Sequence, residues 1–251
     1  MISLKSKREI QIIQEAAEIL RNIFRKVEPA VKPGVTTDEL DQMAEQVIRE
    51  QGGEPAFKGY RGFPKTACIS LNEEVVHGIP GKRKLKDGDL VSFDIGAKVN
   101  GYFADAARTW IVGNGSPQKR LLVDTAREAL QAGLASYHPG CRIGDLAASI
   151  QTLIEARGFE VVRDYVGHGI ARAIHEDPQV LNYRKPGQGP KIQAGLVLAI
   201  EPMVTEGSFA VRTLEDGWTV VTRDGKLSSH YEDTIAFFED RYINLTQDRD
   251  N

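Results

Sequence analysis

Cysteine is scarce in this chain, because only Cys68 and Cys141 occur among its 251 residues. Two cysteines so far apart do not form a disulfide framework, and they favour a reducing compartment. The opening segment MISLKSKREIQIIQ carries charges and lacks the apolar stretch of a signal peptide. No apolar run approaches the roughly 18 residues that a membrane span needs. We therefore expect a cytoplasmic protein without a membrane span.

The chain also lacks a large excess of positive or negative charge, since its formal net charge is only −3. This balance gives no support to a nucleic-acid or membrane partner, both of which favour strongly basic surfaces. Hydrophobic residues make up 41% and charged residues 27% of the chain, as in an ordinary globular protein. The length is sufficient for one sizeable core, but composition alone does not indicate a function.

Hydrophobic periodicity predicts helices followed by strands. Apolar residues at three- and four-residue steps predict a helix over residues 6–28. Capping and stop signals predict further helices over 36–49, 116–137 and 143–157. Segments rich in β-branched and aromatic residues predict strands at TACISL, DLVSFDIGAKV, YFADAARTWIV, LVLAIEPMV, WTVVT and EDTIAFF. The pair Asn100-Gly101 predicts a tight hairpin turn between the second and third of these strands.

An internal repeat connects the two halves of the chain. PGVTTDELDQMAEQVIREQG (33–52) and PGCRIGDLAASIQTLIEARG (139–158) have equal length and both begin with Pro-Gly. GDLVSFD (88–94) aligns with GLVLAIE (195–201) at almost the same spacing. Both aligned strands end on a carboxylate. We expect a single α+β domain over residues 1–251, with pseudo-twofold halves that bring those two carboxylates together.

Four carboxylates lie in or beside apolar strands: Asp94, Asp105, Glu201 and Glu232. Such a group is unfavourable unless it is paired, protonated or bound to a metal. Asp94 and Asp105 flank the two-residue turn at an odd separation, so they should share one face of the hairpin and repel each other. A divalent cation removes the conflict. Carboxylates with a histidine suit Mn, Fe, Co or Zn, and two ions can share carboxylates and a water.

Histidine is rare, with five in the chain, and GHGIARAIHEDP (167–178) contains two of them. Together with NEEVVHGIP, DGDLVSFDIGAKVNGYFADAARTW, LVLAIEPM, DGWTV and YEDT, this segment resembles type I methionine aminopeptidase in order and spacing. The resemblance covers nearly the whole chain. It implies the pita-bread fold, with a central antiparallel sheet and helices on its outer face. The chain is similar to the short bacterial form, because no extension with zinc-binding cysteines precedes the motifs.

The resemblance implies a dinuclear metal centre of cobalt, manganese, iron or zinc, whose identity stays open. The implied ligands are Asp94, Asp105, His168, Glu201 and Glu232, with Asp105 and Glu232 shared by both ions. Glu201 would also be the general base toward a water between the ions. His77 would contact the substrate amide, and His175 would steady the developing oxyanion. A monovalent cation site is implied near Asn72, Glu74 and Ser228.

The methionine pocket implied by the resemblance has six wall residues: Phe57, Tyr60, Phe63, Cys68, Ile174 and Trp218. Phe57 stands where a small residue is frequent in the family. Ala171, Ala173 and Ile174 depart from the usual glycine and aromatic pattern of their segment. None of these departures affects an implied metal ligand. They leave the selectivity of the pocket and the turnover rate open.

The implied reaction removes the N-terminal methionine from nascent proteins and peptides, with preference for a small second residue. Water attacks the first peptide bond. The implied partners are nascent polypeptide N-termini, with a transient ribosome contact. We expect a monomer without nucleic-acid specificity.

Two alternatives come from other classes: a proline-directed, prolidase-like peptidase and a non-enzymatic binding protein of the same fold. Only about 76 residues precede His77, which argues against the additional N-terminal domain that prolidases usually carry. Binding-only relatives lose metal ligands, whereas all five are present here. Single residues also have plain structural interpretations. We interpret His138 as a hydrogen-bonded residue at a helix end and His230 as incidental, with contact to the metal ligands as the alternative. We interpret Cys68 as a packed residue and Trp218 as a core residue as well as a wall candidate.

Overall fold

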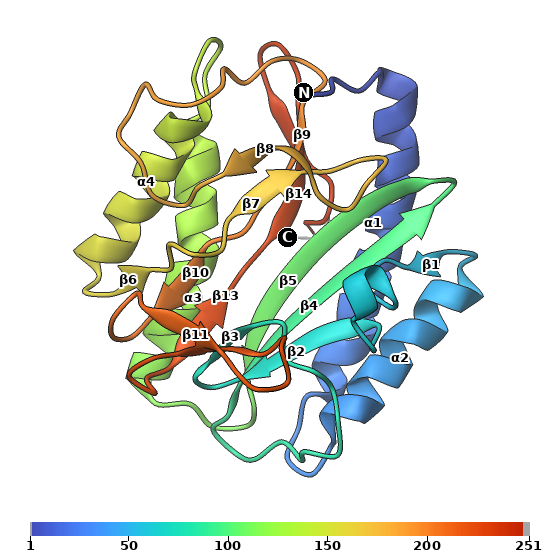
Figure 1. Ribbon diagram of the computed structural model, residues 1–251, viewed down its shortest axis with the longest axis vertical. Coiled ribbons are helices and arrows are strands. Elements are labelled where there is room, and N and C mark those ends of the chain that lie inside the picture. Colours follow the sequence, from blue (N-terminus) through green and yellow to red (C-terminus); the bar gives the residue numbers. More distant parts are fainter. Residues whose placement is uncertain (1, 248–251) are drawn as a thin grey trace.

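A computed structural model describes residues 2–247 of the chain (Figure 1). Its α-helices are α1 (Lys7–Val27), α2 (Thr37–Glu50), α3 (Pro117–Ala135) and α4 (Ile143–Ala156), and its 3-10 turns are η1 (Glu28–Ala30) and η2 (Tyr60–Gly62). The strands are β1 (Glu54–Pro55), β2 (Ala67–Leu71), β3 (Glu74–Val76), β4 (Leu90–Val99), β5 (Tyr102–Ile111), β6 (Glu160–Val161), β7 (Gly167–Gly169), β8 (Glu176–Val180), β9 (Val197–Ile200), β10 (Met203–Thr205), β11 (Val211–Thr213), β12 (Val220–Thr222), β13 (Ser228–His230), β14 (Asp233–Phe237) and β15 (Tyr242–Asn244). Among these residues, no helix is both long and apolar enough to span a membrane.

The helices begin within one residue of the predicted starts, and side chains cap three of them. The Ser6 side chain accepts from the Glu9 amide while the Glu9 carboxylate accepts from the Ser6 amide, and Thr36 and Glu39 repeat this capping box at α2. Ser116 caps α3 directly before its first-turn proline. Each cap satisfies amide groups that the helix itself leaves without partners. The four predicted helices are therefore confirmed, with ends that differ by one or two residues.

The internal repeat is also confirmed. Helix α4 has the same 14-residue length as α2. The residue before each helix forms an isolated antiparallel bridge, Thr36 with Lys84 in one half and Arg142 with Lys191 in the other. The sequence-related halves thus share their supporting contacts as well as their helices, as a pseudo-twofold fold requires.

Two antiparallel sheets form the middle of the molecule. One contains β1, β4, β2 and β5, and the other has the order β15-β14-β9-β7-β8. The two sheets meet where Ala107 and Glu232 exchange backbone hydrogen bonds of 3.2 and 3.0 Å. Two three-stranded sheets, β13-β10-β6 and β11-β12-β3, lie beside them. This junction places β5 of the first half against the start of β14 in the second half.

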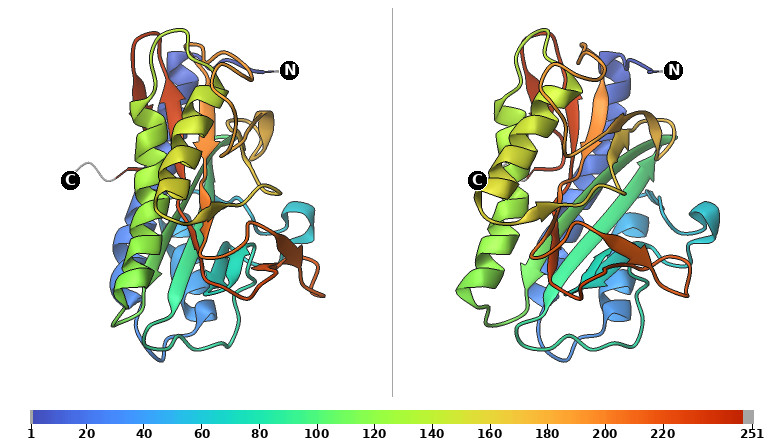
Figure 2. Two further views of the ribbon diagram at one scale, coloured as in Figure 1. Left: turned by 90° about the vertical axis from the view of Figure 1, so that its left-hand side faces the viewer. Right: turned by 60° about the vertical axis from the view of Figure 1, so that its left-hand side comes forward.

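The helices cover one side of the central strands. Helices α1 and α2 pack with β4 and β5 around one apolar core that includes Ile13, Leu20 and Phe93. Helices α3 and α4 form a second core with β9 and β14 that includes Leu130, Ile150 and Phe237. Figure 2 shows the helices together on one side and the β11–β12 region projecting on the other. The side that the helices leave uncovered carries the site described below.

One predicted strand is divided in the structure. We predicted a single run at LVLAIEPMV, but β9 ends at Ile200 and β10 begins at Met203. Pro202 lies between them and has no amide hydrogen for a sheet ladder. Strand β9 pairs with β7 and β14, whereas β10 pairs with β6 and β13. Glu201 therefore follows the end of β9, as the repeat predicted, and occupies a bend between two sheets.

Candidate metal centre and active site

A cavity of about 160 Å³ opens on the side without helices. Every predicted catalytic, metal-binding and pocket residue lines this cavity except Ile174, and Arg61 is an additional wall residue. The lining residues are Phe57, Tyr60, Arg61, Phe63, Cys68, His77, Asp94, Asp105, His168, His175, Glu201, Trp218 and Glu232. Both halves of the chain contribute, so the pseudo-twofold arrangement is what assembles the cavity.

The β4–β5 hairpin places Asp94 beside Asp105, as the turn predicted. Asn100 and Gly101 have φ angles of 49° and 81°, which permit a tight turn with matched strands. Asp94 pairs in register with Ala107 and Gly96 pairs with Asp105, so both carboxylates lie on the same face. Burial, followed by the charge of the neighbouring Asp105, raises the pKa of Asp94 well above its ordinary value, as two carboxylates on one face require.

A symmetrical pair of threonines fixes the junction between the halves. Thr234 Oγ1 accepts from the Asp105 amide at 2.9 Å and donates to the Asp105 carbonyl at 2.8 Å. Thr109 Oγ1 does the same for His230, at 3.0 and 2.7 Å. The backbone positions of Asp105 and His230 are thus each held by two bonds. These bonds fix the backbone positions from which the side chains of Asp105 and His230 extend toward Glu232.

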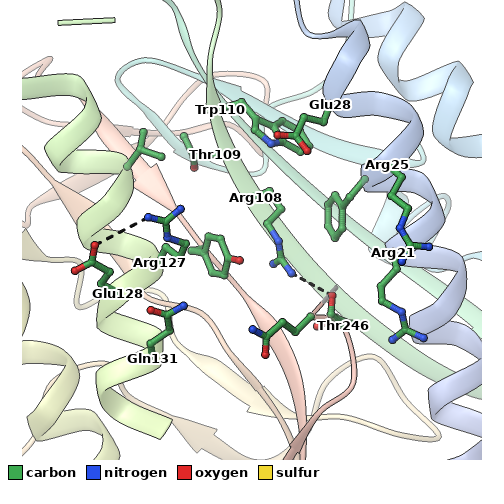
Figure 3. A pocket seen from close by; sticks show the side chains of 14 residues that line it. Arg21, Arg25, Glu28, Arg108, Thr109, Trp110, Arg127, Glu128, Gln131 and Thr246 are labelled. Atoms are coloured by element: carbon green, nitrogen blue, oxygen red, sulfur yellow. Dashed lines mark hydrogen bonds and ion pairs between the residues drawn. The ribbon is translucent and has the colours of Figure 1, made fainter. Parts of the chain in front are cut away.

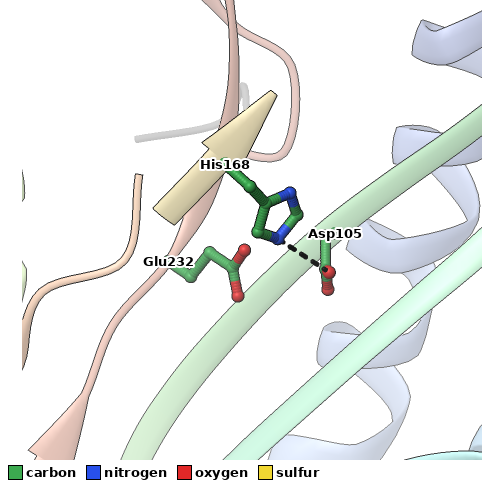
Figure 4. A group of neighbouring side chains, drawn as sticks. All are labelled: Asp105, His168 and Glu232. Carbon is green, nitrogen blue, oxygen red and sulfur yellow. Dashed lines mark ion pairs between the residues drawn. The ribbon is translucent and has the colours of Figure 1, made fainter. Parts of the chain in front are cut away.

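Asp105, His168 and Glu232 converge from three segments. Their donor atoms lie within 4.8 Å of one another, and Figure 4 shows the three side chains directed toward a common point. His168 Nε2 is 4.0 Å from Asp105 Oδ2 and 3.7 Å from Glu201 Oε1. His168 Nδ1 contacts the Gly169 carbonyl at 3.0 Å, which leaves Nε2 free to act as a ligand.

The carboxylates in the cavity lack protein partners on one side. Asp94 Oδ1, Asp105 Oδ1 and Glu232 Oε1 are buried and accept no hydrogen bond. Burial raises the pKa of Asp105 to about 7, and burial with neighbouring carboxylates raises the pKa of Asp94, Glu201 and Glu232. Bringing like-charged groups together without a counter-charge is unfavourable. Unpaired carboxylate oxygens beside a histidine fit the binding of divalent cations.

His230, which the sequence left as an incidental residue or a neighbour of the ligands, lies beside the same carboxylates. Its Nε2 is 3.8 Å from Glu201 Oε2 and 3.9 Å from Glu232 Oε2, and these three residues form a second group of metal-compatible donors. Burial lowers the pKa of His230 to about 3, so the ring is neutral. One indication of this position was present in the sequence: His230 precedes Glu232 by two residues, which places both side chains on one face of a strand. That spacing is too common to identify a site residue by itself.

His77 and His175 lie at the cavity wall with neutral rings. Burial lowers the pKa of His77 to about 4, and burial followed by the charge of Arg61 lowers the pKa of His175. His175 Nδ1 lies 3.0 Å from the Tyr60 hydroxyl and its ring stacks on Tyr60. If that hydroxyl donates to Nδ1, the proton of the neutral ring resides on Nε2. His175 then presents a hydrogen-bond donor from a fixed orientation.

Backbone strain is concentrated at this wall. His77 and Arg61 have φ angles of 61° and 50°. This left-handed region costs residues other than glycine about 1 kcal/mol or more. The next residue, Gly78, is required, because a Cβ there would lie 2.4 Å from the Ile69 carbonyl oxygen. The neighbouring strand therefore holds the His77 backbone in an orientation that free peptide would seldom adopt.

Aromatic side chains form the apolar part of the wall. The rings of Phe63 and Trp218 meet edge-on with centroids 5.1 Å apart, and Trp218 also contacts His77. Cys68 is buried, and burial followed by the charge of Asp94 raises its thiol pKa well above the ordinary value. The thiolate is therefore not available as a nucleophile. Such a surface suits an unbranched apolar side chain with a polarizable sulfur.

The remaining predicted site residues lie outside the cavity. Ile174 is 2% exposed and packs in the core around α1 rather than at the wall. Near the expected monovalent cation, the Ser228 amide donates to the Asn72 carbonyl at 2.8 Å, and the Glu74 carboxylate accepts from the Leu71 amide. That cation site stays a prediction.

A larger cavity of about 560 Å³ lies on the helix-covered side, between α1, β5 and α3 (Figure 3). Arg108 and Trp110 line it from the face of β5 opposite to Asp105, because side chains alternate along a strand. Two of its arginines are paired with carboxylates: Arg108 bonds Asp233 at 2.7 Å, and Arg127 bonds Asp124 at 2.7 Å. It contains no residue predicted to be functional, and it lacks the unpaired carboxylates of the smaller cavity.

Comparisons with known proteins agree with this geometry. The sequence pattern of Metallopeptidase family M24 matches residues 11–237. A methionine aminopeptidase of Clostridium perfringens is 51% identical over 236 residues, which cover 94% of this chain and 95% of that protein. Methionine aminopeptidase 1 of Bacillus subtilis is 50% identical over 98% of this chain and 100% of its own length. The crystal structure of the methionine aminopeptidase from Thermotoga maritima superposes with a TM-score of 0.97 at 43% identity, covering 99% and 100% of the two chains.

The prolidase alternative has weaker support. Prolidase from Pyrococcus furiosus superposes with a TM-score of 0.80, but it is 24% identical and this chain covers only 66% of its length. At that identity the likeness shows the fold alone. The pita-bread fold is therefore shared, while the proteins at 40–51% identity carry the closer relation.

Proposed function

Because the chain belongs to metallopeptidase family M24 and, within it, to the type I methionine aminopeptidases, we propose that it removes the N-terminal methionine from proteins and peptides. The carrying observation is the small cavity in which unpaired buried carboxylates and His168 lie beside an aromatic wall. Charge at one end suits the metal and the reacting bond. The apolar end suits the methionine side chain.

Five residues would hold two divalent ions: Asp94, Asp105, His168, Glu201 and Glu232. Glu232 belongs to both groups of possible donors, and Asp105 would join it as a ligand shared by the two ions, as the family resemblance implies. When bound, the ions supply Lewis acidity that polarises the peptide carbonyl and lowers the pKa of water toward neutrality. Cobalt, manganese, iron and zinc all suit this donor set, so the choice among them depends on availability as well as affinity.

Glu201 and the two wall histidines handle the proton and the carbonyl. The Glu201 carboxylate accepts a proton from the attacking water and returns it to the leaving amine. His175 Nε2 donates to the carbonyl oxygen as negative charge develops there, in the tautomer that the Tyr60 contact favours. His77 contacts the scissile amide from its strained backbone position. Each group is in place before the substrate arrives, which lowers the reorganisation needed during reaction.

The pocket selects its substrate mainly by shape. Phe63 and Trp218 with the buried Cys68 offer an apolar surface for the methionine side chain. A hydrophobic pocket discriminates by about 1–3 kcal/mol per methylene, so similar unbranched side chains should also be cleaved slowly. Tyr60 and Phe57 complete the wall. A substrate whose second residue is small would fit most easily against this wall.

The cellular setting forms part of the same proposal. The two halves jointly build the cavity, so residues 1–251 would act as one catalytic domain. We propose nascent chains in the cytoplasm as its substrates, met during a transient ribosome contact, as the family resemblance implies. The protein would act as a monomer, since both halves of the site lie within one chain.

A peptide assay on metal-stripped protein tests this function. The protein is reloaded separately with Mn, Co, Fe or Zn and given Met-Ala-Ser, the proline peptide Ala-Pro and N-acetylated Met-Ala-Ser. We expect metal-dependent release of methionine from the free Met-Ala-Ser peptide alone. Cleavage of the proline peptide instead would transfer support to a prolidase-like activity. No cleavage with any metal would contradict the proposal.

A further inference from the structure

His230 is a buried histidine without a hydrogen-bond partner for either ring nitrogen. It is 1% exposed, and both Nδ1 and Nε2 are unpaired. A neutral imidazole carries one N–H donor and one lone pair, and each buried unpaired group costs about 1–3 kcal/mol. Two hydrogen bonds with Thr109 hold the His230 backbone in β13, so an ordered strand fixes the position of the ring. Its position therefore requires a physical explanation.

The spacing of its neighbours does not fit hydrogen bonding. Nε2 lies 3.8 Å from Glu201 Oε2 and 3.9 Å from Glu232 Oε2, whereas an N–H···O bond spans about 2.7–3.2 Å. Two ligands of one cation, each about 2.1 Å from it, lie about 3.4 Å apart in tetrahedral geometry and at most about 4.2 Å apart. The observed separations fall inside that range.

His168 provides an internal comparison. Its Nε2 lies 4.0 Å from Asp105 Oδ2 and 3.7 Å from Glu201 Oε1, which is the same spacing from two carboxylates. The two histidines approach the carboxylate group from different strands, β7 and β13. Glu232 belongs to both donor groups, Asp105–His168–Glu232 and Glu201–His230–Glu232. Glu201 also faces both histidines, through Oε1 toward His168 and through Oε2 toward His230.

We infer that His230 is a sixth protein ligand of the metal centre, so that each of the two ions has one histidine nitrogen. This inference rests on the metal-binding part of the proposed function and adds a residue to it. Nitrogen donors on both ions favour Zn, Co or Fe over the harder Mn at the second position. The second ion should therefore be held more firmly and more selectively than carboxylates alone would hold it.

Nitrogen NMR on the wild-type protein tests the inference without a mutation. Protein labelled with ¹⁵N-histidine is stripped of metal and titrated with Zn, and the ring nitrogens are followed in long-range proton–nitrogen spectra. We expect two histidine Nε2 signals to move to metal-coordinated shifts, one for His168 and one for His230. A spectrum in which two Zn ions bind and only His168 shifts would overturn the inference while leaving the metal centre intact.

His230→Gln provides the affinity measurement, with His138→Gln as the matched control outside the site. Isothermal titration with Co should show one of the two ions weakened by more than about 100-fold in His230→Gln, beyond the 10–100-fold effect typical of an outer partner. His138→Gln should bind both ions as the wild type does. Unchanged affinity for both ions in His230→Gln would contradict the inference. Failure of the wild type to bind any ion would instead remove the metal centre itself.

Discussion

Two of the cavities among the described residues differ in how their charges are satisfied. The helix-side cavity is larger, about 560 Å³ against about 160 Å³, and it is rich in arginine. There, Arg108 bonds Asp233 and Arg127 bonds Asp124. In the smaller cavity, Asp105 and Glu232 each retain a buried oxygen without a partner. Unsatisfied buried charge, rather than cavity size, therefore distinguishes the reactive site in this fold.

The contrast has an energetic reason. A folded chain normally satisfies its buried polar groups, as it does around Arg108, because unpaired ones reduce stability. Groups left unpaired in a rigid, strained setting are available for a ligand. The strained backbone of His77 and Arg61 lies at the smaller cavity as well. Both features indicate that the stability lost there is recovered when an ion or substrate binds.

The largest expected effect comes from removing one charge of the smaller cavity. Asp105→Asn should lower kcat/KM by about 10³-fold or more, because several kcal/mol of transition-state stabilisation depend on the bound cations. Metal content, measured by elemental analysis after dialysis, should fall in parallel. Asp124→Asn, on the exposed surface of α3, is the control and should retain both. Full activity and metal content in Asp105→Asn would refute the assignment of Asp105 as a ligand.

The second effect separates metal binding from catalysis in the same cavity. His175→Ala should reduce kcat by about 10²–10³-fold, as loss of an oxyanion donor does, while metal content stays near that of the wild type. Steady-state kinetics and elemental analysis of one preparation measure both quantities. An unchanged kcat would eliminate the oxyanion role of His175.

The third effect belongs to the larger cavity and should appear as stability. Arg108→Met leaves Asp233, a carboxylate with a 3% exposed side chain, without its cation. Losing one partner of a buried pair destabilises by about 3–5 kcal/mol, which denaturant unfolding measures. Arg127→Met is the matched control, since its pair with Asp124 is exposed and should contribute about 1 kcal/mol or less. Equal losses in the two variants would contradict the contrast between buried and exposed pairs.

The smallest effect is a pH dependence of the metal-free protein. Folding raises the pKa of Asp105 to about 7, so the folded state binds this proton more tightly and loses stability as pH rises from 3.8 toward that value. The raised pKa values of Glu201 and Glu232 extend the loss to higher pH. His77 and His168, with pKa values lowered to about 4, oppose it only below pH 6.5.

Between pH 6.5 and 8 the carboxylates therefore determine the sign. The Tm of metal-free protein should fall across this interval, by about 2–4 °C for each kcal/mol lost. The fall should be smaller in Asp105→Asn and absent at saturating metal, because a cation stabilises the charged carboxylates. Thermal scans at matched ionic strength check this, and a Tm that rises with pH in the metal-free wild type would disprove it.

Much of the arrangement follows from local sequence signals. Ser6, Thr36 and Ser116 mark helix starts through their own side chains, and Asn100-Gly101 determines the register that brings Asp94 beside Asp105. These features depend on neighbours in the chain, so sequence reasoning reaches them. The family resemblance supplied the site roles that spacing alone left open.

The features that sequence reasoning missed depend on contacts between distant segments. The bend at Glu201 arises where β9 and β10 join different sheets, and His230 reaches the centre only through the junction of the two halves. Ile174 directly precedes the wall residue His175, but its own side chain packs into the core around α1. Arg61 enters the cavity through a left-handed backbone turn that its sequence does not signal.

Anomalous diffraction from crystals loaded with cobalt tests the central claim most directly. Data collected at the cobalt absorption edge would locate every bound ion without assumptions about ligands. We predict two anomalous peaks in the smaller cavity, in contact with Asp105, His168 and Glu232, and none in the cavity beside Arg108. The absence of peaks among those three residues, or ions bound only at the helix side, would contradict the conclusion that unsatisfied buried charge marks the metal centre.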